Sequence, residues 1–185
     1  MRYRNPLTEL HTHSVINQVP IRENWNLFET DLAIQEALNR EGAGWATELC
    51  SKFGGVLGTE EMDEHARLAN VHSPVLRSFN ARGARIDAVD FHPSYHHIFR
   101  TARSHQTHSM AWTAERGGHV AHTVLEYLLG QVEGGICCPM TMTYAVLPAL
   151  KNHSDLYKQL APKLLSSKYD PRMCPISEKS AITMG

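Results

Sequence analysis

A regular apolar stripe in the second half of the chain most constrains how it can fold. The stripe recurs at intervals of three and four residues and consists of Val120, Val124, Leu125, Leu128, Leu129 and Val132. This spacing places all six side chains on one face of an α-helix. Because an isolated helix of this length is barely stable in water, its apolar face must pack against other elements. The stripe therefore predicts a helical core.

Capping and turn residues divide the rest of the chain into further helices. Thr30 or Asp31 can cap one helix, and Thr59 can open another. Pro93 suits the first turn of a helix that continues to about His108. Together with the stripe, the predicted helical segments lie at about 32–41, 45–53, 59–71, 93–108, 120–132, 138–150 and 155–165.

Glycine pairs and one weak alternation set the remaining boundaries. Gly54-Gly55 and Gly134-Gly135 are expected to end helices, because glycine readily adopts the left-handed backbone that follows a helix C-terminus. Cys138-Pro139 is then expected to begin the next helix. Residues 85–91 alternate weakly, but one strand makes no sheet, so only a local extension is predicted there. The predicted fold class is mainly α, with six or seven helices and little strand.

Length, charge and cysteine usage exclude several classes of protein. The 185 residues suit one domain, and the 18 Lys and Arg residues balance the 19 Asp and Glu residues without any basic block. This charge pattern argues against nucleic-acid binding. No apolar run approaches the roughly 20 residues that span a bilayer, and the first residues resemble neither a secretory signal nor, closely, a transit peptide. The four cysteines form no plausible disulfide framework. An intracellular location is expected, with the cytoplasm ahead of the mitochondrion.

Twelve histidines raise the hypothesis of a metal site. His92 and His96 lie four residues apart, and His105 and His108 lie three apart, so each pair can share one face of a helix. A zinc site needs a third and usually a fourth ligand, and no acidic residue lies at a suitable helical position beside the first pair. The histidines are therefore expected to have surface or packing roles, and no metal ligand is predicted.

The alternating run Met140, Thr141, Met142 and Thr143 is the most distinctive set of candidate site residues. It lies where a helix is expected to begin, so it offers flexible thioethers and small hydroxyls at one place. Such residues suit the wall of a cavity for an acyl chain or for the edge of a flavin ring. Core packing, with the hydroxyls bonded back to the helix, is the simpler explanation from these residues alone.

A series of different short motifs is spread along nearly the whole chain from His13 onward. Two of them are Cys138–Ala145, with the sequence Cys-Pro-Met-Thr-Met-Thr-Tyr-Ala, and the downstream Tyr169-Asp170-Pro171. The others are Asn17–Pro20, Asn26–Phe28, Arg40–Trp45, Arg67–Asn70, Phe91–His96, Gln131–Glu133 and Leu164–Ser166. In this order and spacing, the chain resembles the N-terminal region of the adaptive-response (AidB-type) branch of the flavin-dependent acyl-CoA dehydrogenases.

The resemblance implies the helical N-terminal domain of the acyl-CoA dehydrogenase fold. Residues 1–29 would form an extended segment, 30–170 the helical domain, and 171–185 a loop that leads toward a β-domain. In the complete family protein, FAD binds between the later domains, the catalytic base lies in the last domain, and an acyl-CoA is the substrate. A homo-oligomer is expected for the complete protein. The residues carried over as flavin or acyl pocket lining are Met140, Thr141, Met142 and Thr143.

Two hypotheses for the function follow. In the first, the chain is the N-terminal portion of a flavin-dependent acyl-CoA dehydrogenase-like protein. It would not be catalytic alone, because the family's Met-Thr-Glu-Lys-Gln-Gly-Gly-Ser-Asp flavin motif is expected just after Gly185. In the second, it is a stand-alone, non-catalytic helical module that binds fatty acyl chains or a full-length relative. Neither hypothesis predicts a cofactor for the 185-residue chain by itself.

Overall fold

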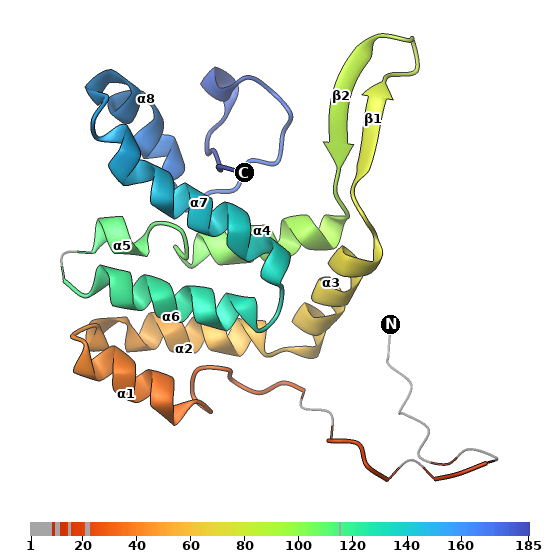
Figure 1. Ribbon diagram of the computed structural model, residues 1–185, viewed down its shortest axis with the longest axis vertical. Coiled ribbons are helices and arrows are strands. Elements are labelled where there is room, and N and C mark those ends of the chain that lie inside the picture. Colours follow the sequence, from red (N-terminus) through yellow and green to blue (C-terminus); the bar gives the residue numbers. More distant parts are fainter. Residues whose placement is uncertain (1–8, 10–11, 15, 21–22, 115) are drawn as a thin grey trace.

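The computed structural model describes residues 9, 12–14, 16–20, 23–114 and 116–185. Most of the described chain is helical, which confirms the predicted fold class (Figure 1). The described part contains eight α-helices, one or two more than predicted, because the short α5 had no separate signal. The helices are α1 (Leu32–Arg40), α2 (Thr47–Leu57), α3 (Glu60–Val71), α4 (Pro93–Ser104), α5 (Met110–Thr113), α6 (Gly118–Gly130), α7 (Gly134–Leu150) and α8 (Ser154–Leu164). Short 3₁₀ helices cover Gly44–Ala46 and Ile176–Glu178.

Three predicted helix starts are confirmed by their caps. The Asp31 carboxylate accepts a hydrogen bond from the Ile34 N–H at 3.1 Å, so it caps α1. The Thr59 hydroxyl accepts from the Met62 N–H at 3.2 Å and caps α3 in the same way. Pro93 occupies the first position of α4, where its missing N–H costs nothing. These starts depend on residues close in sequence.

The prediction that Gly54-Gly55 ends α2 is wrong, because the helix continues to Leu57. Gly54 lies inside α2, where its missing side chain allows Phe28 to pack closely against the helix. A Cβ atom there would lie 2.7 Å from the Phe28 backbone nitrogen and 2.8 Å from the Phe28 Cβ. The Leu27 N–H also donates to the Gly54 carbonyl at 3.2 Å. The segment before α1 therefore lies directly on the α2 backbone.

The boundaries around α7 also differ from the prediction. Gly134-Gly135 begins α7 rather than ending the helix before it, and Cys138-Pro139 lies inside α7. The Glu133 side chain causes this start, since its carboxylate accepts from the Gly135 N–H at 3.0 Å and the Ile136 N–H at 2.7 Å. A carboxylate at a helix N-terminus is further favoured by the helix dipole.

The helix that begins at Pro93 ends at Ser104 instead of continuing to His108. Gln106 has a φ of 59°, a left-handed conformation that turns the chain away from the helix axis. The turn brings Thr107 and His108 into the interior, where both are buried.

Residues 85–91 are not a lone extension, because a strand that the sequence analysis missed pairs with them. β1 (Val75–Phe79) and β2 (Arg85–Asp90) form an antiparallel hairpin with Leu76 opposite Val89. Gly83, with a φ of 77°, supplies the turn. The hairpin extends away from the helices between the end of α3 and the start of α4 (Figure 1).

The predicted stripe lies at the centre of the core. Its helix, α6, contacts α1, α2, α5 and α7, and Leu125, Leu128 and Leu129 are fully buried. Each such leucine contributes about 2 kcal/mol through burial. A smaller apolar cluster joins α7 and α8 to the chain end and consists of Leu147, Ala161, Leu164 and Ile182. In the part of the chain that the structure describes, no helix is both long and apolar enough to cross a bilayer.

Candidate functional site

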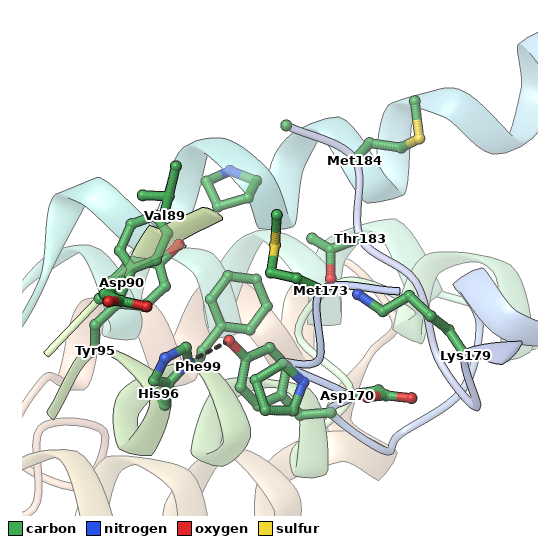
Figure 2. A pocket seen from close by; sticks show the side chains of 15 residues that line it. Val89, Asp90, Tyr95, His96, Phe99, Asp170, Met173, Lys179, Thr183 and Met184 are labelled. Carbon is green, nitrogen blue, oxygen red and sulfur yellow. Dashed lines mark hydrogen bonds between the residues drawn. The ribbon is translucent and has the colours of Figure 1, made fainter. Parts of the chain in front are cut away.

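A pocket of about 350 Å³ opens where the base of the hairpin meets α4, α7 and the last residues of the chain (Figure 2). This volume lies within the range of small-molecule sites. Residues 166–185, called the C-terminal segment below, form one side of it. The lining residues are Val89, Asp90, Phe91, Tyr95, His96, Phe99, Pro139, Tyr169, Asp170, Pro171, Met173, Lys179, Thr183, Met184 and Gly185.

Stacked aromatic rings form the floor of the pocket. Phe91 and Tyr95 stack at 4.3 Å between ring centroids, and Phe99 and Tyr169 stack at 4.7 Å. A 2.7 Å hydrogen bond joins His96 Nδ1 to the Tyr169 hydroxyl, as Figure 2 shows. Burial raises the pKa of Tyr169, while burial and then Arg100 lower the pKa of His96. These shifts favour the neutral form of both rings, so the floor is aromatic and uncharged.

The charged groups at the rim of the pocket are mostly paired. Asp90 binds Arg77 across the hairpin. Asp170 binds Arg172, with an Nη2 to Oδ2 distance of 2.7 Å, and also accepts from the Ser180 N–H at 2.9 Å. Hydrogen bonds from Arg172, and next from the Ser180 N–H, hold the pKa of Asp170 well below its usual range. These bonds fix the shape of the C-terminal segment at the pocket.

A buried arginine holds the C-terminal segment against the helices. Arg103 of α4 is fully buried, and its guanidinium donates to Ser166 O at 2.6 Å, Lys168 O at 2.7 Å and Ile182 O at 3.0 Å. Its remaining acceptors are Lys163 O, Leu164 O and Thr183 Oγ1. Burial lowers the pKa of Arg103 to about 10, so the side chain still carries its charge at neutral pH. Sequence reasoning missed this residue, and no local pattern marks it.

The four predicted site residues divide between two faces of α7. Met140 and Thr143 are buried, whereas Thr141 and Met142 face outward. The Thr143 hydroxyl donates to Pro139 O at 2.7 Å and accepts from the Met184 N–H at 3.0 Å, so it ties α7 to the C-terminal segment. Pro139, but none of the four, lines the pocket of Figure 2. That these residues line a flavin or acyl site stays a prediction.

The outward face of α7 carries no charge. The helix has no Asp, Glu, Lys or Arg between Gly134 and Leu150, although half of it faces solvent. Its exposed side chains include Cys138, Thr141, Met142, Ala145 and Ala149. Surface helices usually place charged residues on their outer face, and helices that lack them are normally covered. This face therefore has the composition of a buried surface.

The histidines considered as metal ligands make protein contacts instead. His92 Nδ1 accepts from the Ser94 N–H at 3.2 Å, and His105 stacks on Phe53. His108 is buried and bonds the Ser166 carbonyl. Burial, followed by Arg103, lowers its pKa to about 3. Within the described residues, no group of three or more His, Cys, Asp or Glu side chains is arranged to hold a metal ion.

Comparison with known proteins identifies the family. Residues 17–171 match the family described as "Adaptive response protein AidB N-terminal domain". The chain belongs to this AidB N-terminal domain family. It is also 38% identical over 177 residues to the Escherichia coli (strain K12) protein named "Putative acyl-CoA dehydrogenase AidB". That match covers 94% of the chain and 33% of the relative, so the chain spans about a third of the relative's length.

Two solved structures of other proteins share the fold of this chain. One is the Caenorhabditis elegans protein ACDH-11 in complex with C11-CoA, with a TM-score of 0.70 and 19% identity over 88% of this chain and 30% of that one. The other is the apo form of Bd2924, with a TM-score of 0.72 and 23% identity over 80% of this chain and 31% of that one. At these identities the likeness establishes the fold alone.

Proposed function

We propose that this AidB-type N-terminal domain forms one helical wall of the flavin and acyl site in a longer acyl-CoA dehydrogenase-like protein. The charge-free outward face of α7 carries the proposal, because a helix of this composition is expected to be covered. Thr141 and Met142 lie on that face and fit contact with a flat, apolar ring or an acyl chain. Met140 and Thr143 would support the wall from behind.

In such a protein, FAD would supply the hydride-acceptor chemistry for oxidation of an acyl thioester, and residues of this chain would form one wall of its site. This chain would contribute positioning and exclusion of water. The Met142 thioether can follow the shape of an apolar ligand, and the Thr141 hydroxyl can donate one hydrogen bond to it. No carboxylate lies on α7, so that helix supplies no base for removing the α-proton. The base is expected from another part of a complete protein, whereas this chain would contribute part of the subunit packing of a homo-oligomer.

An apolar groove favours the second hypothesis, a stand-alone module that binds fatty acyl chains or a full-length relative. The groove of about 440 Å³ runs between α1 and α6 and is lined by Asp31, Ala33, Ile34, Ala37, Val120, Thr123, Val124 and Tyr127. Its size and apolar lining suit a single acyl chain.

The four cysteines are free, which fits a reducing compartment, and we place the protein inside the cell, most simply in the cytoplasm. The bacterial relative lends no support to a mitochondrial location.

A chimera tests the first hypothesis. Residues 1–185 replace the matching third of the E. coli relative, and bound FAD is measured by absorbance. We expect Met142→Lys to lower flavin occupancy at least about tenfold, because it places a charge on a face that is to be buried. Leu156→Lys, at an exposed position on α8, is the matched control and should keep full occupancy. Full flavin content in the Met142→Lys chimera, or stoichiometric flavin in the isolated chain, would contradict the proposal.

Binding of decanoate to the isolated chain tests the second hypothesis by calorimetry. If the groove holds an acyl chain, Ala33→Asp, at an exposed position that lines the groove, should abolish the binding and Met142→Lys should not. A chain that binds no decanoate and remains monomeric would rule this hypothesis out.

A further inference from the structure

Two histidines close the base of the β1–β2 hairpin. His72 is the residue that ends α3, just before β1, and His92 is the capping residue of α4, just after β2. Their rings stack with centroids 4.7 Å apart and planes 14° from parallel. The two ends of the hairpin are therefore joined to α3 and α4 by residues whose imidazole rings stack on each other.

A second histidine pair lies farther along the same helix interface. His65 of α3 stacks on His97 of α4 at 4.0 Å, with the planes 19° apart. His65 Nδ1 is also 3.0 Å from the Ser94 hydroxyl, at the start of α4. The two pairs together join α3 to α4, the His72–His92 pair at the hairpin's attachment and the His65–His97 pair deeper between the two helices.

The groups around these rings give little compensation for positive charge. The Glu61 carboxylate lies 3.8 Å from His65 Nε2 and acts on the His65–His97 pair. Burial, followed by His65, lowers the pKa of His97, and Arg100 adds to this while Glu61 opposes it. Near the His72–His92 pair, the Asp90 carboxylate already binds Arg77.

Protonation acts against each pair in a specific way. Two protonated rings at these distances repel each other, because like charges a few ångströms apart near a protein surface interact strongly. Protonated His92 can no longer accept the Ser94 N–H through Nδ1, and a cation at the N-terminus of α4 opposes the helix dipole. The neutral rings, by contrast, stack and cap without conflict.

We propose that the two stacked pairs, His72–His92 and His65–His97, form a proton-sensitive lock that fixes the hairpin to the helices at neutral pH and releases it as the pH falls. The hairpin depends on such an attachment, since two strands alone are barely stable and Val75, Leu76 and Phe79 remain exposed. Its Val89 and Asp90 line the pocket of Figure 2, so release opens one wall of that pocket.

Hydrogen exchange of the 185-residue chain at pH 7.5 and pH 5.5 tests the lock. Protection factors, which remove the intrinsic pH dependence of exchange, are compared for the β1–β2 ladder amides and for α6. We expect ladder protection to fall about tenfold or more at pH 5.5, because release of the hairpin lets four rings bind protons that the stacked arrangement opposes. Protection in α6 should change less than about twofold.

Variants separate the lock from general acid sensitivity. His72→Phe/His97→Phe keeps a ring in every stack but removes one charge from each pair, so the pH effect on the ladder should shrink to less than about threefold. If the double variant does not fold, His92→Asn replaces it, because asparagine keeps an acceptor that can cap α4 but cannot be protonated. His153→Asn, at an exposed position before α8, is the control and should keep the full effect. The proposal is overturned if ladder protection is equal at both pH values, if α6 loses protection equally, or if the variants retain the full effect.

Discussion

The helical bundle and the C-terminal segment are ordered by different forces. The bundle has a continuous apolar core that includes Phe53, Leu125 and Leu129, all fully buried. The C-terminal segment buries only Ala181 and Ile182 among its apolar residues and has a single turn of 3₁₀ helix. The buried Arg103 guanidinium holds it by donating hydrogen bonds to its backbone carbonyls. A segment with little core of its own can thus be fixed by one desolvated cation, provided that every donor finds an acceptor.

The largest effect is expected from Arg103→Ala, which removes the bonds between the bundle and the C-terminal segment. Several carbonyls would lose their donor inside the protein, so we expect a loss of about 3–5 kcal/mol in the free energy of unfolding. Urea denaturation measures it, and limited proteolysis should cut the C-terminal segment first. Arg82→Ala, at an exposed position in the hairpin turn, is the control. A loss below about 1 kcal/mol would show that the guanidinium does not hold the segment.

Leu128→Ala tests the other side of the comparison. This side chain is fully buried in the core of α6, so its truncation should cost about 3 kcal/mol through lost burial and a cavity. Proteolysis should then show global unfolding without early release of the C-terminal segment. If Leu128→Ala and Arg103→Ala gave the same cleavage pattern, the two regions would form a single cooperative unit.

A smaller, pH-dependent effect is expected inside the bundle at Glu126. Burial raises its pKa from 4.5 to about 7, a bond with Cys137 partly opposes this, and its Oε1 has no hydrogen-bond partner among the described residues. Because the folded pKa exceeds the unfolded one, this contribution to stability is complete below pH 4.5 and is lost as the pH rises through 7.

Glu126→Gln should therefore raise the free energy of unfolding by about 1 kcal/mol at pH 8 and leave it nearly unchanged at pH 4.5, the partial exposure of the carboxyl limiting the gain. Urea denaturation at both pH values measures the difference. Glu36→Gln, on the exposed face of α1, should show no such pH dependence.

Local signals predicted the helices well, and contacts between distant residues account for what was missed. Asp31, Thr59 and Pro93 define helix starts within one turn of their own position. The strand Val75–Phe79 lacks a clear alternation and is ordered by its partner strand. In the sequence, Gly54 resembles the end of a helix, and only its close contact with Phe28 in the structure explains why glycine is present.

The candidate site was predictable only in part for the same reason. The Tyr169-Asp170-Pro171 motif was recognised, but its bond to His96 joins residues 73 positions apart. Arginine is rarely buried completely, so sequence alone gave no reason to assign Arg103 a structural role. The opposite orientations of Met140 and Met142 required the true start of α7, which the buried Glu133 sets.

The Arg103 contacts also have a consequence for the order of events during protein synthesis. Domains fold largely from the N-terminus as the chain leaves the ribosome, and α4 emerges well before its partners. The acceptors of Arg103 range from Lys163 to Thr183, so the guanidinium cannot be desolvated until nearly all 185 residues have been made. The bundle would thus remain hydrated around this cation while the C-terminal segment is being made, and the pocket would take shape after the bundle.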